Sequence, residues 1–110
     1  MDIQKFLEEW IDLGNAYDVE RYLSKYQEDA VIDDPSVGSS FNMHEGIREY
    51  FESYFIDYKT QTRLIDIKIN DNKAYVKVEF TGDFPGNKIG GTFDIIFKSG
   101  KISHITADLL

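Results

Sequence analysis

Two adjacent carboxylates, Asp33 and Asp34, stand directly before a proline and form the stretch of this 110-residue chain most suited to chemistry. The apolar run of residues 30–32 before them is typical of a short strand, and Pro35 favours an extended conformation at Asp34. A carboxylate at the end of such a strand can point into a cavity enclosed by the flanking elements. Asp34 is therefore a candidate general base. The alternative is that one of the two carboxylates only caps a turn before the proline, and Asp33, of opposite strand parity, is expected to be solvated.

The histidines and the nearby serines give weaker signals. His44 falls in the first turn of an expected helix, where the helix dipole disfavours a cation, so a surface position is favoured over a role as a pocket acid or base. His104 should face the side of the last strand away from the cavity, at a dimer interface or in solvent. Ser36 and its neighbours lie in a Gly/Ser-rich turn without the context of a nucleophile. No cysteine is present and the histidines have no carboxylate at ligand spacing, so neither a metal site nor a cofactor is expected.

Aromatic residues make up 15% of the chain and could line a ligand cavity. Tyr50 and Tyr54 are the better candidates, because a buried phenol needs a hydrogen-bond partner. Aromatic stripes at helical spacing are also typical of an ordinary core. The substrate-binding candidates are Trp10, Tyr17, Tyr50, Tyr54 and Phe93.

Hydrophobic spacing near 3.6 residues predicts helices in the first half of the chain. The first spans residues 3–13 with Asp2 as its cap, and a shorter one follows Asp18. A third runs from about residue 43 to residue 58, with Asn42 at the start of an apparent capping box.

From Gln61 onward the hydrophobic period changes to 2, which predicts a four-stranded meander. Its first strand places Ile65, Ile67 and Ile69 on one face. Two adjacent glycines, Gly90-Gly91, indicate a bulge or a sharp bend. The remaining strands are expected around residues 74–81, 88–98 and 101–109.

The totals indicate one compact domain, residues 1–110. The net charge of −8 would repel nucleic-acid phosphates and anionic lipids, so neither nucleic-acid nor membrane partners are expected. No run is suited to spanning a bilayer or to acting as a signal peptide, and a cytoplasmic setting is the default expectation. The order of elements predicts an α+β fold, in which N-terminal helices pack on a strongly curved antiparallel sheet.

The chain resembles the nuclear transport factor 2-like superfamily, which has a cone-shaped α+β fold and includes ketosteroid isomerases, SnoaL-type polyketide cyclases and limonene epoxide hydrolases. The resemblance covers essentially the whole chain through element order. It is most specific in residues 26–35, YQEDAVIDDP, and residues 44–51, HEGIREYF, which are similar to the ketosteroid isomerase pattern. The turn at residues 99–102, SGKI, resembles a hairpin common in the superfamily.

The resemblance implies that Asp34 lies where those isomerases keep their general base. They also hold the developing enolate oxygen with two donors, a tyrosine on the first helix and a protonated aspartic acid on a late strand. Trp10 falls at the first position, and the second falls near Phe93, with Asp94 one residue away on the opposite face. Losing one such donor costs on the order of 3–4 kcal/mol. Steroid isomerisation itself is therefore disfavoured.

The expected function is that of a small-molecule pocket protein, a cofactor-free isomerase or cyclase in which Asp34 acts as general base on a hydrophobic carbonyl compound and Trp10 or a tyrosine acts as donor. The alternative is a non-catalytic module that binds a ligand, dimerises or holds a partner. An epoxide hydrolase would need an inward-facing arginine, and none is evident. The expected partners are a small hydrophobic ligand and a second copy, paired through the open sheet face that carries Tyr75 and Ile96, as members of this superfamily often do.

Overall fold

The computed structural model describes all residues from 1 to 110. Its helical elements are α1 (Ile3–Asn15), α2 (Val19–Ser24), α3 (Met43–Phe51) and the π-helical turn η1 (Glu52–Ile56). Its strands are β1 (Tyr26–Asp34), β2 (Ser39–Asn42), β3 (Gln61–Asn70), β4 (Lys73–Thr81), β5 (Lys88–Lys98) and β6 (Lys101–Leu109). None of the helices combines the length and the hydrophobicity that crossing a bilayer needs.

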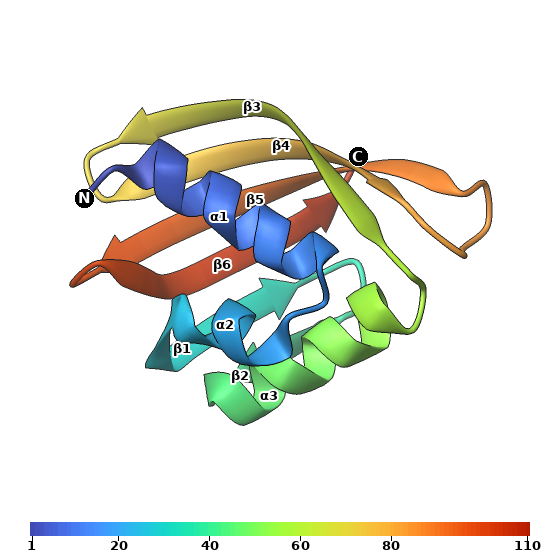
Figure 1. Cartoon of the computed structure of the whole chain (residues 1–110), viewed down its shortest axis with the longest axis horizontal. Helices are drawn as coiled ribbons and strands as arrows, with labels where there is room; N and C mark the ends of the chain where they lie inside the picture. Colours follow the sequence, from blue (N-terminus) through green and yellow to red (C-terminus); the bar gives the residue numbers. More distant parts are fainter.

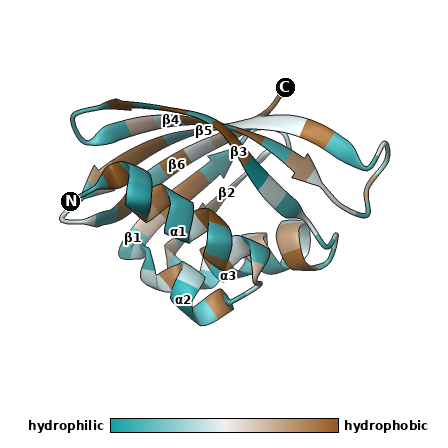
Figure 2. Cartoon of the chain, turned by 45° about the horizontal axis from the view of Figure 1, so that its top comes forward, coloured by the Kyte–Doolittle hydropathy of each residue, from teal (hydrophilic) through white to brown (hydrophobic).

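All six strands form one sheet in the order β2-β1-β6-β5-β4-β3. Figure 1 shows the sheet curving around the helices, with α1 across its concave side and α2 and α3 on that same side. The turned view of Figure 2 shows that no helix covers the opposite side. The predicted α+β fold is confirmed. The sheet is mixed rather than wholly antiparallel, because β1 pairs in parallel with β6 while every other neighbouring pair is antiparallel.

The predicted meander is confirmed in β3 to β6, and β5 and β6 have the predicted bounds. The inward-facing residues of β4 alternate with exposed ones, as a period of 2 requires. Ser99 and Gly100 both have positive φ, 50° and 79°, which suits the tight hairpin between β5 and β6.

Two details of the meander differ from the prediction. The register of β3 shifts between Leu64 and Asp66, so Leu64 and Ile67 pack against the core while Ile65 is 46% exposed. Ile65 therefore does not share a buried face with Ile67. At Gly90-Gly91 the pairing with β4 continues without a bulge. Gly91 instead makes room for a ring, since a Cβ there would lie 2.4 Å from Cε2 of Phe80.

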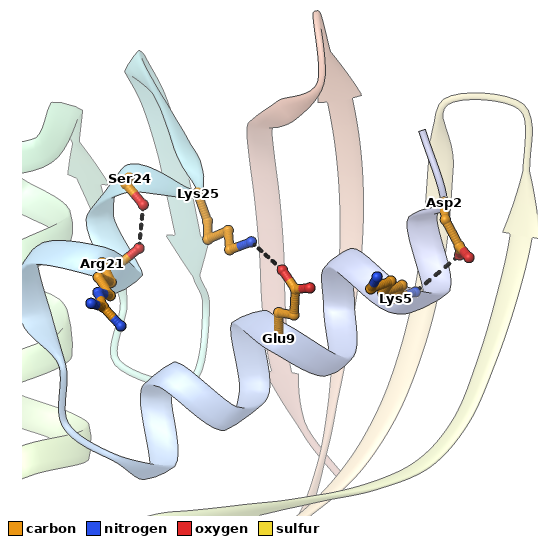
Figure 3. A network of polar contacts seen from close by, with 6 residues as sticks. All are labelled: Asp2, Lys5, Glu9, Arg21, Ser24 and Lys25. Carbon is orange, nitrogen blue, oxygen red and sulfur yellow. Dashed lines mark hydrogen bonds and ion pairs between the residues drawn. The ribbon is translucent and has the colours of Figure 1, made fainter.

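Polar contacts fix the first helix at its start and near its middle (Figure 3). Asp2 caps α1 as predicted, because its side chain accepts a hydrogen bond from the backbone N–H of Lys5 at 3.0 Å. Glu9 lies 2.9 Å from Nζ of Lys25, at the junction of α2 and β1. The hydrogen bond and the charge of Lys25 lower the pKa of Glu9. This ion pair ties α1 to the strand that ends at Asp34.

The segment around the carboxylates departs most from the prediction. β1 has nine residues instead of a short central run, and β2, which was predicted as turn, pairs with it antiparallel. Asn42 makes no side-chain cap, so the predicted capping box is wrong. The α-helical part of the predicted third helix ends at Phe51. The chain then continues as the wider π-helical turn η1 to Ile56, two residues short of the predicted end at residue 58.

The core fills the space between the helices and the concave side of the sheet with 21 buried hydrophobic residues. Leu7 from α1, Ile47 and Phe51 from α3, and Val76 from β4 have no exposed surface. On the uncovered face, Tyr75 and Ile96 are 39% and 37% exposed. The core leaves one end of the concave side open, and Asp34 lies there.

Candidate functional site

Asp34 is the last residue of β1, and only 7% of it is exposed. The tight turn of residues 35–38 follows it, and within this turn the backbone N–H of Ser36 donates to Oδ1 of Asp34 at 3.0 Å. The hydroxyl of Ser36 donates to the same oxygen. This is the turn-capping geometry typical of an aspartate two residues before a backbone donor. The turn and the proline thus fix the carboxylate rather than leaving it free.

The other oxygen of Asp34 is held by the third helix. The hydroxyl of Tyr50, which is buried in α3, donates to Oδ2 of Asp34 at 2.6 Å. Burial and, next to it, the hydrogen bond and charge of Asp34 raise the pKa of Tyr50 far above that of an ordinary phenol. Tyr50 therefore acts as a fixed hydrogen-bond donor and not as an acid that releases its proton.

A pocket of about 300 Å³ opens beside this pair. Its lining includes Asp34 and the hydroxyl-bearing residues Ser36, Tyr50 and Thr60. Its apolar wall comes from the end of α3 and η1, from β4, β5 and β6, and from the loop between β4 and β5. The wall includes Tyr54, Phe55, Tyr58, Phe80 and Phe84. Asp34 is the only charged residue that lines the pocket.

The loop of residues 82–87, predicted as the longest loop after the third helix, covers one side of the pocket with Phe84 and Pro85. Its backbone N–H at Asp83 donates to the carbonyl of Tyr58 at 2.6 Å, and the rings of Tyr58 and Phe84 meet edge to face. Gly82 allows this approach, since a Cβ there would lie 2.8 Å from both the Tyr58 carbonyl and the Phe84 ring. The loop therefore packs directly against Tyr58, in the segment that follows η1.

The structure brings together only some of the candidate residues. Tyr50 and Tyr54 line the pocket with Asp34. Trp10 and Phe93 do not line it. They pack edge to face in the core with ring centroids 5.2 Å apart.

The indole N–H of Trp10 is already engaged, because it donates to the hydroxyl of Tyr26 at 3.1 Å. Asp94 is exposed on the outer face. The structure therefore does not bring to Asp34 the donor that was expected on the first helix. Tyr17 also lies outside the pocket, behind its wall, where its hydroxyl donates to the carbonyl of Thr60 at 3.1 Å.

The histidines lie apart from the pocket. His44 is half-buried, and its Nε2 lies 3.0 Å from the carbonyl of Tyr26. His104 faces the outer side of the sheet, as predicted, and its Nε2 lies 2.7 Å from Oδ2 of Asp33. Hydrogen bonds from Ser40 and then from His104 lower the pKa of Asp33. The side chain of Asp33 is 42% exposed, in line with the expectation that it is solvated, and the parallel pairing of β1 with β6 also brings it beside His104.

Sequence reasoning missed the part of the site that depends on turns and loops. Ser36 was read as part of an undefined turn, although an aspartate two residues before a serine is a recognised turn motif. For Phe84 and Pro85 the sequence predicts only that they lie in a loop. No local pattern places that loop against Tyr58, which is more than 20 residues away in the chain. No group of three or more metal-ligating side chains is present in the structure.

The family model for the SnoaL-like domain matches residues 7–105. Among solved structures, a candidate polyketide cyclase from Sinorhizobium meliloti superposes with a TM-score of 0.86 at 18% identity, covering 94% of this chain and 93% of that one. A candidate ketosteroid isomerase from Kribbella flavida gives 0.84 at 16% identity, covering 96% and 76%. An NTF2-like protein of unknown function from Cytophaga hutchinsonii gives 0.83 at 12% identity, covering 100% and 91%.

No curated protein matches the chain. At these identities the likeness to the solved structures concerns the fold, and the family rests on the match over residues 7–105. That match spans the strand that ends at Asp34, the third helix with Tyr50, and the meander that closes the pocket. The chain belongs to the SnoaL-like domain family and has the NTF2-like fold.

Proposed function

We propose that the pocket takes a small, largely apolar carbonyl compound and that Asp34 moves a proton on it as a general base, without a cofactor. The observation that carries the proposal is the position of Asp34. It is a buried carboxylate, fixed by a turn and by Tyr50, and it is the only charged residue in a largely apolar pocket. General bases in enzymes work from such positions, within hydrogen-bond reach of the bound substrate.

The proton transfer needs a general base and a hydrogen-bond donor to the developing enolate oxygen. A substrate whose α-carbon lies against the carboxylate gives a proton to Asp34, and the electron pair of the C–H bond forms an enolate. Tyr54 and Tyr58 line the pocket, and the hydroxyl of neither is used in a hydrogen bond within the protein. Of the two, we assign Tyr54 as the donor to the enolate oxygen, because its ring lies next to that of Tyr50, which holds Asp34. Return of the proton from Asp34 to the γ-carbon of a β,γ-unsaturated ketone completes an isomerisation.

The size of the pocket limits the substrate. Pockets for small molecules span about 300–1,000 Å³, and this one is at the lower end. One or two rings suit it better than a larger skeleton. The chain shares its fold with a candidate polyketide cyclase and a candidate ketosteroid isomerase. This likeness supports carbonyl chemistry only through the fold.

The test uses cyclohex-3-en-1-one, whose conversion to the conjugated cyclohex-2-en-1-one is followed by ultraviolet absorbance. Because a positioned base contributes roughly 10²- to 10⁴-fold, Asp34→Asn should lower the rate by about that factor. Asp33→Asn is the matched control, since it removes the same charge one residue away. A wild-type rate no higher than that of the control buffer, or equal rates in wild type and Asp34→Asn, would refute the proposal.

A second candidate function is ligand binding without chemistry. It is favoured by the hydrogen bonds that Asp34 already accepts, two at Oδ1 from Ser36 and one at Oδ2 from Tyr50. Each of these bonds stabilises the carboxylate as it stands, and one must weaken when the carboxylate takes a proton. A ligand that saturates the pocket without any turnover would support this function.

A further inference from the structure

The charge of Asp34 has no positive counterpart in its surroundings. Its hydrogen-bond partners, Ser36 and Tyr50, are both neutral. No lysine, arginine or histidine lines the pocket. A buried carboxylate gives up much of its hydration, and neutral donors replace only part of it. The pocket therefore presents an uncompensated negative charge to whatever enters.

The rest of the wall adds a second attraction for positive charge. Six aromatic rings line the pocket: Tyr50, Tyr54, Phe55, Tyr58, Phe80 and Phe84. Several are close neighbours, with centroids 5.4 Å apart for Tyr50 and Tyr54 and 5.9 Å for Phe55 and Phe80. Rings attract a cation within about 6 Å of their centroids, and cages of rings recognise quaternary ammonium groups. These six rings line a pocket of about 300 Å³, which is small enough for a bound cation to contact the aromatic wall.

The three kinds of ligand can be compared on these grounds. An anion is repelled by Asp34 and by the net charge of −8. A neutral polar molecule finds free donors only in the hydroxyls of Tyr54 and Tyr58, because those of Ser36, Tyr50 and Thr60 are used within the protein. An organic cation gains from both the carboxylate and the rings, and its apolar groups fill the remaining space.

We propose that this pocket binds a small organic cation, an ammonium or quaternary nitrogen compound whose charged nitrogen lies against Asp34 among the aromatic rings. The inference rests on the pocket of the proposed function but not on the proton transfer. It adds that a ligand with a positively charged nitrogen binds better than a neutral one of the same shape.

The experiment compares two probes that differ only in charge, choline and 3,3-dimethylbutan-1-ol, in which carbon replaces the quaternary nitrogen. Both are titrated into the ¹⁵N-labelled protein, and affinity is taken from amide shifts at the pocket. Choline should bind about tenfold tighter or more. Asp34→Asn should remove most of this preference, whereas Asp33→Asn, with the same change in net charge, should keep it. Tyr54→Leu, which removes one ring and leaves the carboxylate, should reduce it in part and serves if Asp34→Asn does not fold.

Equal affinities for the two probes, no binding of either, or an undiminished preference in folded Asp34→Asn would overturn the inference. If Asp34→Asn does not fold, an undiminished preference in Tyr54→Leu would overturn it instead. The outcome is independent of the proposed reaction. A choline preference without any isomerisation of cyclohex-3-en-1-one supports the cation site and refutes the proton transfer. Isomerisation that choline does not inhibit competitively supports the proton transfer and contradicts the cation site.

Discussion

Two polar networks lie among aromatic rings in this molecule, and only one of them borders a pocket large enough for a ligand. In the first, the indole of Trp10 donates to Tyr26, whose hydroxyl donates to Tyr22 at 2.8 Å. In the second, Ser36 and Tyr50 donate to the carboxylate of Asp34. The void beside the first is about 10 Å³, and the pocket beside the second is about 300 Å³.

The two networks show that a polar group buried among aromatic rings can serve either the packed core or a pocket. The first network consists of neutral groups that satisfy one another, and the void beside it is about the size of one water molecule. The second includes a charged group whose partners hold it in place without neutralising it. Burial alone is therefore a poor sign of function here. The useful sign is a buried charge that borders a pocket.

The largest expected effect comes from truncating a ring in each region. Trp10→Ala should lower the free energy of unfolding by about 3–5 kcal/mol, because it leaves a closed cavity in a packed core. Tyr54→Ala should cost only about 1 kcal/mol, because that side chain is half-buried beside a space that is already open. Urea unfolding followed by far-ultraviolet circular dichroism measures both. Equal losses would show that the pocket wall is packed like the core.

A smaller effect is expected from removing one hydroxyl in each network. Tyr26→Phe leaves the Trp10 N–H without an acceptor in the sealed core, which should cost about 1–3 kcal/mol. Tyr50→Phe leaves Oδ2 of Asp34 without its donor, but Asp34 borders a pocket wide enough for water. We expect a water molecule to replace the hydroxyl, so the cost should stay below about 1 kcal/mol. Urea midpoints followed by tryptophan fluorescence compare the two. A larger loss for Tyr50→Phe would mean that the Asp34 network is needed for stability and is not poised for binding.

The sequence predicted the meander well, because its strands are joined by short local turns. The alternation in β4 and β5 and the Ser99-Gly100 hairpin are all properties of neighbouring residues. β2 was missed, since its sequence is polar and it becomes a strand only by pairing with β1. The extent of β1 depends in turn on parallel pairing with β6, about 70 residues later.

The same difference between local and long-range contacts explains which parts of the site could be predicted. Asp34 could be chosen from its place before a proline at the end of an apolar run. The spacing of Trp10, Tyr50 and Tyr54 shows that each points inward from its helix, but not how far away the opposing layer lies. The sheet meets Trp10 closely, whereas η1 and the loop of residues 82–87 leave room beside Tyr54. That room is set by contacts between distant segments, which a single sequence does not record.

A modest effect is expected for Tyr22→Phe, and its dependence on pH tests how tightly the first network is sealed. Burial raises the pKa of Tyr22 to about 12. An unfolded tyrosine loses its proton near pH 10, so the folded state holds this proton more tightly than the unfolded state does. The resulting stability is complete below about pH 10 and is lost as the pH rises through about 12.

The variant lacks this titration, so its cost of about 1 kcal/mol at about pH 8 should shrink at about pH 11. Urea unfolding of wild type and Tyr22→Phe at the two pH values measures the change, with Tyr54→Phe as the control from the pocket wall. If the difference between wild type and Tyr22→Phe stays constant, water reaches Tyr22. The first network would then be accessible to water like the second, and the two networks would not differ in accessibility.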